Sequence, residues 1–296
     1  MFLGEHLKKK GIDGEVANAI LLIAGESKRI KSAFFSNGDQ AQTKNVYGER
    51  QMELDKLADE MIIEALRKAG IVSEIASEEQ PDVIKVAKKG VSVNLDPLDG
   101  SSCIKTNFPV GTIFGIFKEG GCLQEGRKLG AAGYVLYGPL TVLVYAAKGK
   151  GVHEFILHGG KYALRRENIR MPPGTIYGIG GLKRDWTAQH TRYIETLEGK
   201  GYKLRYGGAF VADFHQVLTY GGVFTYPALR EKPNGKLRLL FEGAPMAFVS
   251  EEAGGSSTNG TVSLLDIKPG KVDQRVPLYV GSKDSIELAE KTLKGK

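Results

Sequence analysis

The chain has 296 residues, enough for about two domains, and its 25% charged and 42% hydrophobic residues are typical of a globular protein, which excludes a disordered or fibrous chain. The 41 lysine and arginine residues outnumber the 34 aspartate and glutamate residues, and the resulting net charge of +7 attracts anions without selecting one. Because the basic residues are scattered and no nucleic-acid-binding motif occurs, we expect no nucleic-acid partner. Two cysteines cannot form a disulfide framework, which favours the reducing cytoplasm.

The first part of the chain predicts two helices. No signal-peptide pattern precedes them, because Asp13 and Glu15 interrupt any apolar run after the first lysines. The apolar run over residues 16–24 predicts a helix that ends at Gly25. Apolar side chains spaced three and four residues apart over residues 52–69 predict the second helix.

Several strands follow, which together with the helices indicate an α/β fold. The first strand, over residues 91–95, alternates apolar and polar residues and ends at Asp96. The uncharged stretch 129–147 is divided by glycines and Pro139, so it predicts two strands joined by a turn and no membrane span. The predicted strands after the first are 112–117, 134–137, 141–146 and 152–157.

A linker separates the two halves of the chain. Charged residues followed by Pro172 and Pro173 mark it, since Pro-Pro continues neither a helix nor a strand. We place the boundary near residue 168, which gives the halves 1–168 and 169–296. The second half predicts helices at 186–197, 209–218 and 241–253, strands at 202–206, 223–226 and 277–280, and a final lysine-ended helix.

The sequence Asp-Pro-Leu-Asp-Gly-Ser-Ser at residues 96–102 is the most informative segment. Pro97 fixes its own φ and favours an extended residue before it, so the carboxylates of Asp96 and Asp99 can face one point. Carboxylate and carbonyl oxygens are the ligands that Mg²⁺ prefers. The residues that follow offer amides and hydroxyls to a phosphate: Gly100, Ser101 and Ser102. The alternative is an ordinary turn, since all these residue types except leucine form turns.

Further acids lie around this motif, and each has an ordinary interpretation as well. Asp55 and Glu49 suit the N-terminal turn of a helix, where the macrodipole favours acids. Adjacent Glu78 and Glu79 suit a solvated surface. Glu242 suits an ion pair with the arginine four residues before it, Arg238. The number of acids around one motif favours a metal site over these separate interpretations.

The motif at 96–102, followed by Val-Gly-Thr-Ile-Phe-Gly-Ile at 110–116, resembles class I fructose-1,6-bisphosphatases, within the lithium-sensitive, metal-dependent sugar phosphatases that include inositol monophosphatases. The similarity covers nearly the whole chain from about residue 15, and its second-half segments are specific to the bisphosphatase branch. The other similar segments are 45–49, 77–79, 131–138, 204–206, 220–227 and 234–242. The resemblance implies a layered α/β/α/β/α sandwich whose first half supplies the metals and whose second half supplies sugar specificity.

The resemblance also assigns the metal ligands and the catalytic acids. Asp55 and Glu79 match the pair that activates the attacking water, and Glu49 matches a nearby acid that is usually aspartate. Two or three Mg²⁺ ions, or Mn²⁺, would neutralise the phosphate, lower the pKa of a water and stabilise the leaving alkoxide. No covalent nucleophile is then needed. The implied metal ligands are Glu78, Glu79, Asp96, the Leu98 carbonyl, Asp99 and Glu242.

In the second half, Lys236, Tyr206 and Tyr226 resemble the residues that hold the distal 6-phosphate, although core packing is the alternative for each tyrosine. Arg205 resembles an arginine that is donated across a subunit interface, which implies a homodimer or homotetramer. Residues 178–182 lack an asparagine and a tyrosine that many relatives use for the same phosphate, so part of this pocket is altered.

We therefore expect a Mg²⁺-dependent phosphatase that releases the 1-phosphate of fructose 1,6-bisphosphate in gluconeogenesis or a sugar-phosphate cycle. The alternatives are sedoheptulose-1,7-bisphosphatase activity, alone or in addition, an activity like that of inositol monophosphatases, and a non-catalytic anion-binding protein. The converging acids argue against the last. Mammalian relatives are inhibited by AMP at a loop that corresponds here to residues 24–28, with a Lys-Tyr pair where this chain has Gly90 and Val91, so we expect weak or absent inhibition.

Overall fold

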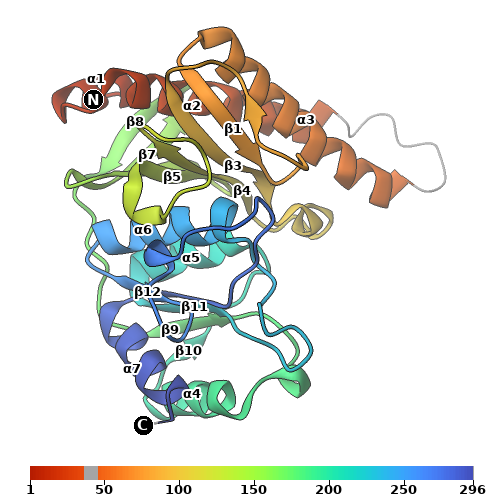
Figure 1. The fold of residues 1–296 in the computed structure, drawn as a ribbon, viewed down its shortest axis with the longest axis vertical. Coiled ribbons are helices and arrows are strands. Elements are labelled where there is room, and N and C mark those ends of the chain that lie inside the picture. Colours follow the sequence, from red (N-terminus) through yellow and green to blue (C-terminus); the bar gives the residue numbers. More distant parts are fainter. Residues whose placement is uncertain (37–45, 296) are drawn as a thin grey trace.

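Helices and sheets alternate in five layers in the computed structural model, which describes the backbone of residues 1–36 and 46–295 and the side chains of residues 1–34 and 54–295 (Figure 1). Three helices cover the outer face of the larger sheet: α1 (Leu3–Lys9), α2 (Gly14–Ser36) and α3 (Val46–Ala69). Two helices lie between the sheets: α5 (Phe210–Tyr220) and α6 (Ala244–Glu252). Two more cover the outer face of the smaller sheet: α4 (Ala188–Gly199) and α7 (Lys283–Leu293). The predicted α/β/α/β/α sandwich is confirmed.

The larger sheet has eight strands in the order β2-β1-β3-β4-β5-β6-β7-β8. β1 and β3 are parallel, and every other neighbouring pair is antiparallel. All residues of β3, β4 and β6 are buried, because helices cover both faces of the sheet. The strands are β1 (Val72–Ser77), β2 (Ile84–Lys85), β3 (Val91–Asp99), β4 (Val110–Phe117), β5 (Leu129–Tyr137), β6 (Thr141–Ala147), β7 (Gly151–His158) and β8 (Lys161–Arg166).

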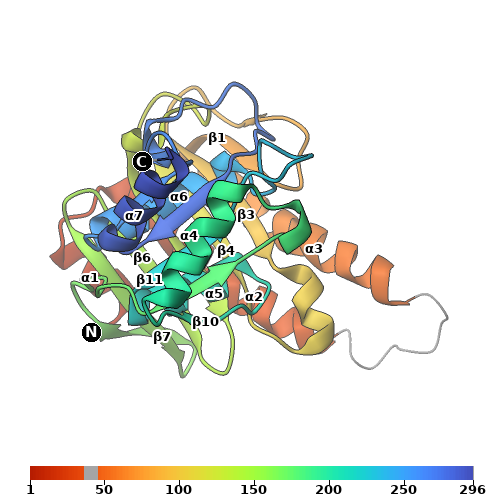
Figure 2. The same ribbon diagram turned by 90° about the horizontal axis from the view of Figure 1, so that it is seen from below.

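The smaller sheet has five strands in the order β10-β9-β11-β13-β12, and Figure 2 shows α4 and α7 lying across it. Its strands are β9 (Ile176–Ile179), β10 (Lys203–Leu204), β11 (Gly222–Tyr226), β12 (Ser256–Thr258) and β13 (Leu278–Gly281). Phe214 of α5, Phe224 of β11 and Met246 of α6 share one apolar core with Tyr134 of the larger sheet. The two sheets are therefore joined by a common core, and the boundary near residue 168 stays a prediction.

The predicted helix end at Gly25 is wrong, because α2 continues to Ser36. A glycine inside a helix costs only about 1 kcal/mol relative to alanine, and burial of Ile23, Ala24 and Ile30 along this helix outweighs that cost. Residues 24–28 are consequently helical and do not form the predicted loop.

The strand predicted at 91–95 is correct but too short, since β3 continues past Asp96 to Asp99. Its register against β4 shifts between these two aspartates, so the proline is accommodated in an irregular part of the ladder. The polar residues of the alternation are buried too. Ser92 contacts the Ser73 hydroxyl at 3.0 Å, and the Asn94 amide donates to the Cys122 carbonyl at 3.3 Å.

Other differences lie in the short elements. The strand predicted at 202–206 is reduced to β10, and the helix predicted at 241–253 begins with a π-helical turn, η4 (Leu239–Gly243), before α6. The helix predicted at 186–197 begins at Ala188. The predicted strands at 112–117, 134–137, 141–146, 152–157 and 223–226 are confirmed. The sequence analysis did not specify α1, β1, β2, β8, β9 and β12, most of which have little hydrophobic periodicity of their own.

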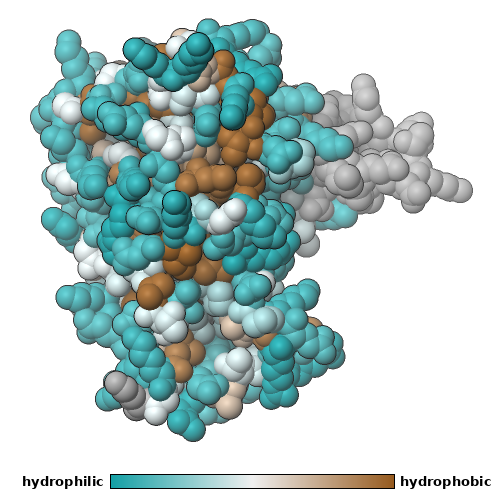
Figure 3. Space-filling model, in the orientation of Figure 1, coloured by the Kyte–Doolittle hydropathy of each residue, from teal (hydrophilic) through white to brown (hydrophobic). Residues whose placement is uncertain are grey.

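Hydrophilic side chains predominate on the face shown in Figure 3, and the hydrophobic ones gather at its mid-height and upper right. Within the part of the chain that the structure describes, no helix is long and apolar enough to cross a membrane.

At Gly100, the end of β3 contacts the second half of the chain. Its φ is +79°, a left-handed conformation that favours glycine, and a Cβ atom here would lie 2.2 Å from the Cβ of Ala209. The 3₁₀-helix η1 (Ser101–Thr106) starts immediately after it. The backbone of the 96–102 motif thus touches the start of α5, and only glycine allows this approach.

We predict that Gly100→Ala destabilises the protein by roughly 2–5 kcal/mol, because a left-handed residue costs about 1–2 kcal/mol and overpacking about 1–3 kcal/mol more. Urea unfolding measures the change. The matched control is Gly149→Ala, since Gly149 has φ +68° with nothing within 4 Å of a Cβ atom, so that this variant carries only the backbone cost. Equal destabilisation of the two variants would contradict the close contact.

Candidate active site

The parallel pairing of β1 and β3 places the first acids of the site side by side. Ser77 pairs with Leu95, so the next residues along the two strands, Glu78 and Asp96, are neighbours. The Glu78 amide donates to the Leu95 carbonyl at 3.0 Å and extends the ladder by one residue. Acids that are separate in the sequence therefore meet at one end of this strand pair.

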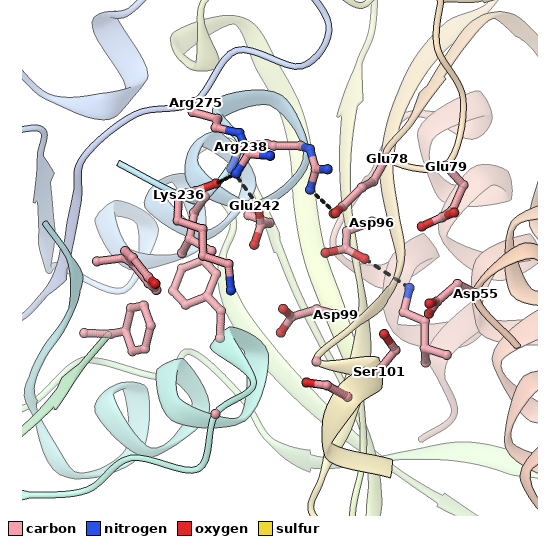
Figure 4. Close-up of a pocket in the computed structure, with 18 of the residues that line it drawn as sticks. Asp55, Glu78, Glu79, Asp96, Asp99, Ser101, Lys236, Arg238, Glu242 and Arg275 are labelled. Atoms are coloured by element: carbon pink, nitrogen blue, oxygen red, sulfur yellow. Dashed lines mark hydrogen bonds and ion pairs between the residues drawn. The ribbon is translucent and has the colours of Figure 1, made fainter. Parts of the chain in front are cut away.

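Asp96, Asp99 and Glu242 form the buried centre of the site (Figure 4). None is more than 8% exposed, and one oxygen from each lies within 4.8 Å of the other two. Backbone amides fix the three carboxylates: Leu98 N donates to Asp96 at 3.0 Å, Val211 N to Asp99 at 2.6 Å and Arg238 N to Glu242 at 2.6 Å. Glu242 reaches this centre from η4.

Burial raises the pKa of all three acids, and neighbouring charges raise it further. Burial, with the charges of Glu78 and Asp213, raises the pKa of Asp99 to about 7 against the lowering effect of its amide donor. The pKa values of Asp96 and Glu242 lie well above the usual range, first through burial and then through the charge of Glu78.

A divalent cation fits this centre. Three buried carboxylates cost free energy because they are desolvated and because they repel one another. A cation that lies between them reduces both costs. Carboxylate and backbone carbonyl oxygens are the donor set of hard cations such as Mg²⁺ and Mn²⁺, and Leu98 lines the same cavity as the three acids. Asp96, Asp99 and Glu242 are grouped closely enough to hold one ion. The other predicted ligands line the same cavity and could contribute: Glu78, Glu79 and Leu98.

Asp55 and Glu79 lie beside this centre (Figure 4). Burial raises the pKa of Asp55 to about 7; a hydrogen bond from the Ser101 side chain opposes the shift, and the charge of Glu79 adds to it. The pKa of Glu79 is also raised, by partial burial first and then by the charge of Glu78. A carboxylate whose pKa is raised is a better proton acceptor, so these two groups can accept a proton from a water molecule. Glu49 lies outside the residues whose side chains the structure describes.

The cavity continues toward the second half of the chain and has a volume of about 330 Å³. Lys236, Tyr206 and Tyr226 also line it, and the Lys236 ammonium lies 5.6 Å from the Tyr226 ring centre. The Lys236 charge also lowers the pKa of Asp99 in part, so the basic and acidic sides face each other across the cavity. Gly100, Ser101 and Ser102 also line the cavity, and Ser101 lies beside Asp55 and Asp99 (Figure 4).

Arg205 does not line this cavity. Its guanidinium lies over the Tyr220 ring at 4.7 Å and donates to Gln216 at 3.3 Å, on the exposed side of α5. The structure thus brings together the described residues of the predicted site with the exception of Arg205.

Two arginines of the site were not predicted to be part of it. The Arg238 guanidinium forms an ion pair with Glu78, and the expected side-chain pair with Glu242 is absent, because residue 238 precedes the π-helical turn in an extended conformation. Arg275 lines the cavity and donates to the Lys236 carbonyl at 2.6 Å. Arg238 is only two residues from Lys236, and this short spacing could have associated it with the predicted site.

A second cluster of potential ligands, His6, His153 and Glu167, has its atoms within 4.8 Å of one another. Both ring nitrogens of His153 are occupied, since Nε2 donates to the Lys150 carbonyl at 2.9 Å and Nδ1 accepts from the Asn168 amide at 3.2 Å. With no lone pair left on that ring, the cluster serves to hold α1 against the sheet.

Comparison with known proteins shows similarity along almost the entire chain. Residues 15–167 match the family described as fructose-1-6-bisphosphatase, N-terminal domain, and residues 171–294 match fructose-1-6-bisphosphatase, C-terminal domain. The class 1 fructose-1,6-bisphosphatase of Methanocorpusculum labreanum is 48% identical over 290 residues, covering 97% of this chain and 90% of that protein. That of Geotalea uraniireducens is 48% identical over 295 residues, covering 97% and 94%. The crystal structure of Leishmania major fructose-1,6-bisphosphatase in holo form is similar with a TM-score of 0.90 and 28% identity, covering 99% of this chain and 98% of that one.

We predict that the metal-free protein becomes less stable as the pH rises from about 4 to 7. The folded-state pKa of Asp99 is about 7, above the unfolded value near 3.9, so the folded chain binds more protons in this range and its free energy of unfolding decreases with rising pH. A cation competes with these protons, so MgCl₂ should raise the melting temperature more at pH 8 than at pH 5.5.

Thermal unfolding in EDTA and in MgCl₂ at both pH values measures these effects. In EDTA at pH 8, Asp99→Asn should melt at least about 2 °C above the unchanged protein, a shift of roughly 1 kcal/mol for a chain of this size, because the amide carries no charge. The same variant should lose most of the MgCl₂ effect. A melting temperature at pH 8 that MgCl₂ leaves unchanged would contradict a cation site here.

Proposed function

The chain belongs to the fructose-1,6-bisphosphatase family and is a phosphatase, and we propose that it converts fructose 1,6-bisphosphate to fructose 6-phosphate and phosphate by removing the 1-phosphate. The observation that carries this proposal is one cavity that is lined both by buried carboxylates and by Lys236, Tyr206 and Tyr226. Such a cavity suits a substrate with a phosphate at each end.

The residues around the cavity suggest how the substrate is held. Lys236 and the hydroxyls of Tyr206 and Tyr226 bind the 6-phosphate, because ammonium and hydroxyl groups are good phosphate donors. Ser101 and Ser102 line the cavity beside the acids, where amides and hydroxyls can hold the 1-phosphate. Fixing the distal phosphate brings the reacting phosphate to one orientation and reduces the entropy cost of the reaction.

Asp55 and Glu79 take the proton from the attacking water. Burial raises the pKa of Asp55 to about 7, close to what a general base needs at neutral pH, and it also raises the pKa of Glu79. The Ser101 side chain holds the Asp55 carboxyl in place. When bound, Mg²⁺ would supply positive charge that offsets the phosphate and the leaving oxygen.

We propose two or three Mg²⁺ ions per chain, replaceable by Mn²⁺, and a role in gluconeogenesis in the cytoplasm. The acidic centre described above supports the cation. The free thiols of Cys103 and Cys122 support a reducing compartment. Glu49 stays a proposed catalytic acid on the family resemblance alone.

We also propose a homo-oligomer, a dimer or a tetramer. The position of Arg205 supports it, since this arginine lies outside its own cavity on the exposed side of α5, where it could reach a neighbouring subunit. Sedimentation at working concentration tests this, and a fully active monomer would refute it.

Phosphate release from fructose 1,6-bisphosphate, with MgCl₂ and with EDTA, is the experiment that tests the proposed function. We expect release only with MgCl₂. The kcat/KM for this substrate should exceed the values for sedoheptulose 1,7-bisphosphate and for inositol 1-phosphate. A higher value for either of those would assign the activity to that substrate.

We predict that Asp96→Asn reduces kcat by at least about 10³-fold while the protein stays folded, because the cation site loses one of its buried carboxylates. Asp55→Asn should also lower kcat but leave the MgCl₂-dependent rise in melting temperature largely unchanged. Steady-state kinetics and thermal unfolding of both variants separate loss of chemistry from loss of the cation. Full turnover by Asp96→Asn would exclude this site.

Lys236→Ala should mainly raise the KM for fructose 1,6-bisphosphate, by about tenfold or more, because it removes one charged contact to the distal phosphate. Lys232→Ala is the matched control, since Lys232 is an exposed lysine nearby that does not line the cavity. An unchanged KM in Lys236→Ala would refute the proposed 6-phosphate site.

A further inference from the structure

The segment between β10 and α5 carries Tyr206 and Gly208, both of which line the cavity. It contains little regular structure, since β10 ends at Leu204 and α5 begins at Phe210. Gly208 has φ +96°, so the chain turns sharply here. Something other than a strand ladder must therefore fix the position of Tyr206.

Asp213, on the first turns of α5, supplies that constraint. Its carboxylate is 2% exposed and accepts two hydrogen bonds from the segment: from the Gly207 amide at 2.7 Å and from the Gly208 amide at 3.2 Å. A side chain on Gly207 would crowd the same carboxylate, because a Cβ atom there would lie 3.2 Å from Asp213 Oδ1. One rigid helical residue thus binds both peptide groups that follow Tyr206.

Burial of the Asp213 carboxylate costs free energy, and this cost indicates that its two hydrogen bonds have a functional role. Among the described residues Asp213 has no ion pair within 4.0 Å, and burial raises its pKa to about 6 against the effect of the two amides. Its charge also acts on Tyr206, where it adds to burial in raising the pKa of the phenol.

The other side of the same helix start is held from the metal centre. Val211 donates its amide to Asp99 at 2.6 Å, and Ala209 lies against Gly100. Ala209, at the N-cap position of α5, has no side-chain oxygen of its own to do this. The start of α5 is consequently fixed relative to the acids. Because Asp213 lies on the same helix and binds the segment after Tyr206, it holds Tyr206 in a fixed position relative to those acids as well.

On the basis of the proposed function, we propose that Asp213 is a positioning residue for the distal phosphate: it holds residues 206–208 so that the Tyr206 hydroxyl faces the cavity shared with Lys236 and Tyr226. Asp213 acts through Tyr206 and does not itself touch the substrate. An acid in the first turns of a helix also stabilises the helix dipole, which is the purely structural alternative.

Kinetics with two substrates distinguish these roles. Fructose 1,6-bisphosphate carries the distal phosphate and fructose 1-phosphate does not. Asp213→Ala should raise the KM for the bisphosphate about tenfold, as expected when a hydrogen bond to a charged group is misplaced, with kcat changed less than threefold. For fructose 1-phosphate, kcat/KM should change less than threefold. Equal losses on both substrates, or an unchanged KM for the bisphosphate, would overturn the proposal.

Asp213→Asn keeps the size of the side chain and one acceptor oxygen, so it tests the proposal if the alanine variant does not fold. Its KM should rise less than that of the alanine variant, and in the Tyr206→Phe background the rise should largely disappear, since the hydroxyl being positioned is gone. If Asp213→Asn raises KM just as much in the Tyr206→Phe background, action through Tyr206 is refuted. Asp284→Asn is the matched control, because Asp284 also accepts a backbone amide, that of Gly174 at 3.1 Å, away from the cavity.

Calorimetric binding of fructose 6-phosphate gives a readout that does not need turnover. Its Kd should rise about tenfold in Asp213→Ala and stay unchanged in Asp284→Asn; an unchanged Kd in Asp213→Ala would count against the proposal. Turnover by the unchanged protein separates the two hypotheses. If it releases no phosphate from fructose 1,6-bisphosphate, the proposed function fails, whereas normal turnover with an unaffected Asp213→Ala variant refutes only the positioning role.

Discussion

Mutual repulsion of buried carboxylates at the end of β1 and β3 is the constraint on which the site depends. Asp96, Asp99 and Glu242 are almost fully removed from water and lie within reach of one another, so their charges have neither solvent nor enough counter-charge. Arg238 forms its ion pair with Glu78, and its charge only partly opposes the raised pKa of Glu242. A fold that keeps such a cluster gives up stability for a place where positive charge binds strongly, as is common at catalytic sites.

The start of α5 relates this acidic centre to the sugar side of the cavity. Asp99 both faces the other acids and caps the helix through the Val211 amide, and Asp213 on the same helix binds the segment that carries Tyr206. Because α5 packs between the two sheets, its position is set by the common apolar core. The position of Tyr206 relative to the acidic centre is therefore set by the packing of α5 and by the hydrogen bonds that Asp213 accepts.

Much of the site could be predicted from local sequence. The acids at 96 and 99 and the serines after them are close in the chain, so their proximity hardly depends on the rest of the fold. Lys236, Tyr206 and Tyr226 followed from resemblance, and the structure places them along the same cavity. Arg238 and Arg275 were not predicted as site residues, because their partners, Glu78 and the Lys236 carbonyl, lie far away in the sequence. Asp213 was not predicted either, although the amides it accepts from, those of Gly207 and Gly208, are only six and five residues away, because no sequence pattern indicates that contact.

By itself the sequence determined the fold class, most of the long strands and helices, the acidic motif and the resemblance to sugar bisphosphatases, all of which follow from hydrophobic periodicity and from residues adjacent in the chain. Only the tertiary structure decided which charges meet. Arg238 and Glu242 are four residues apart, yet the arginine pairs with Glu78, since the i,i+4 geometry exists only within an α-helix and this segment is extended before a π-helical turn. Likewise Asp99 caps α5 because the backbones of Gly100 and Ala209 touch. Hydrogen bonds and ion pairs act over a few ångströms, so their partners are chosen by how the layers pack and not by distance along the chain.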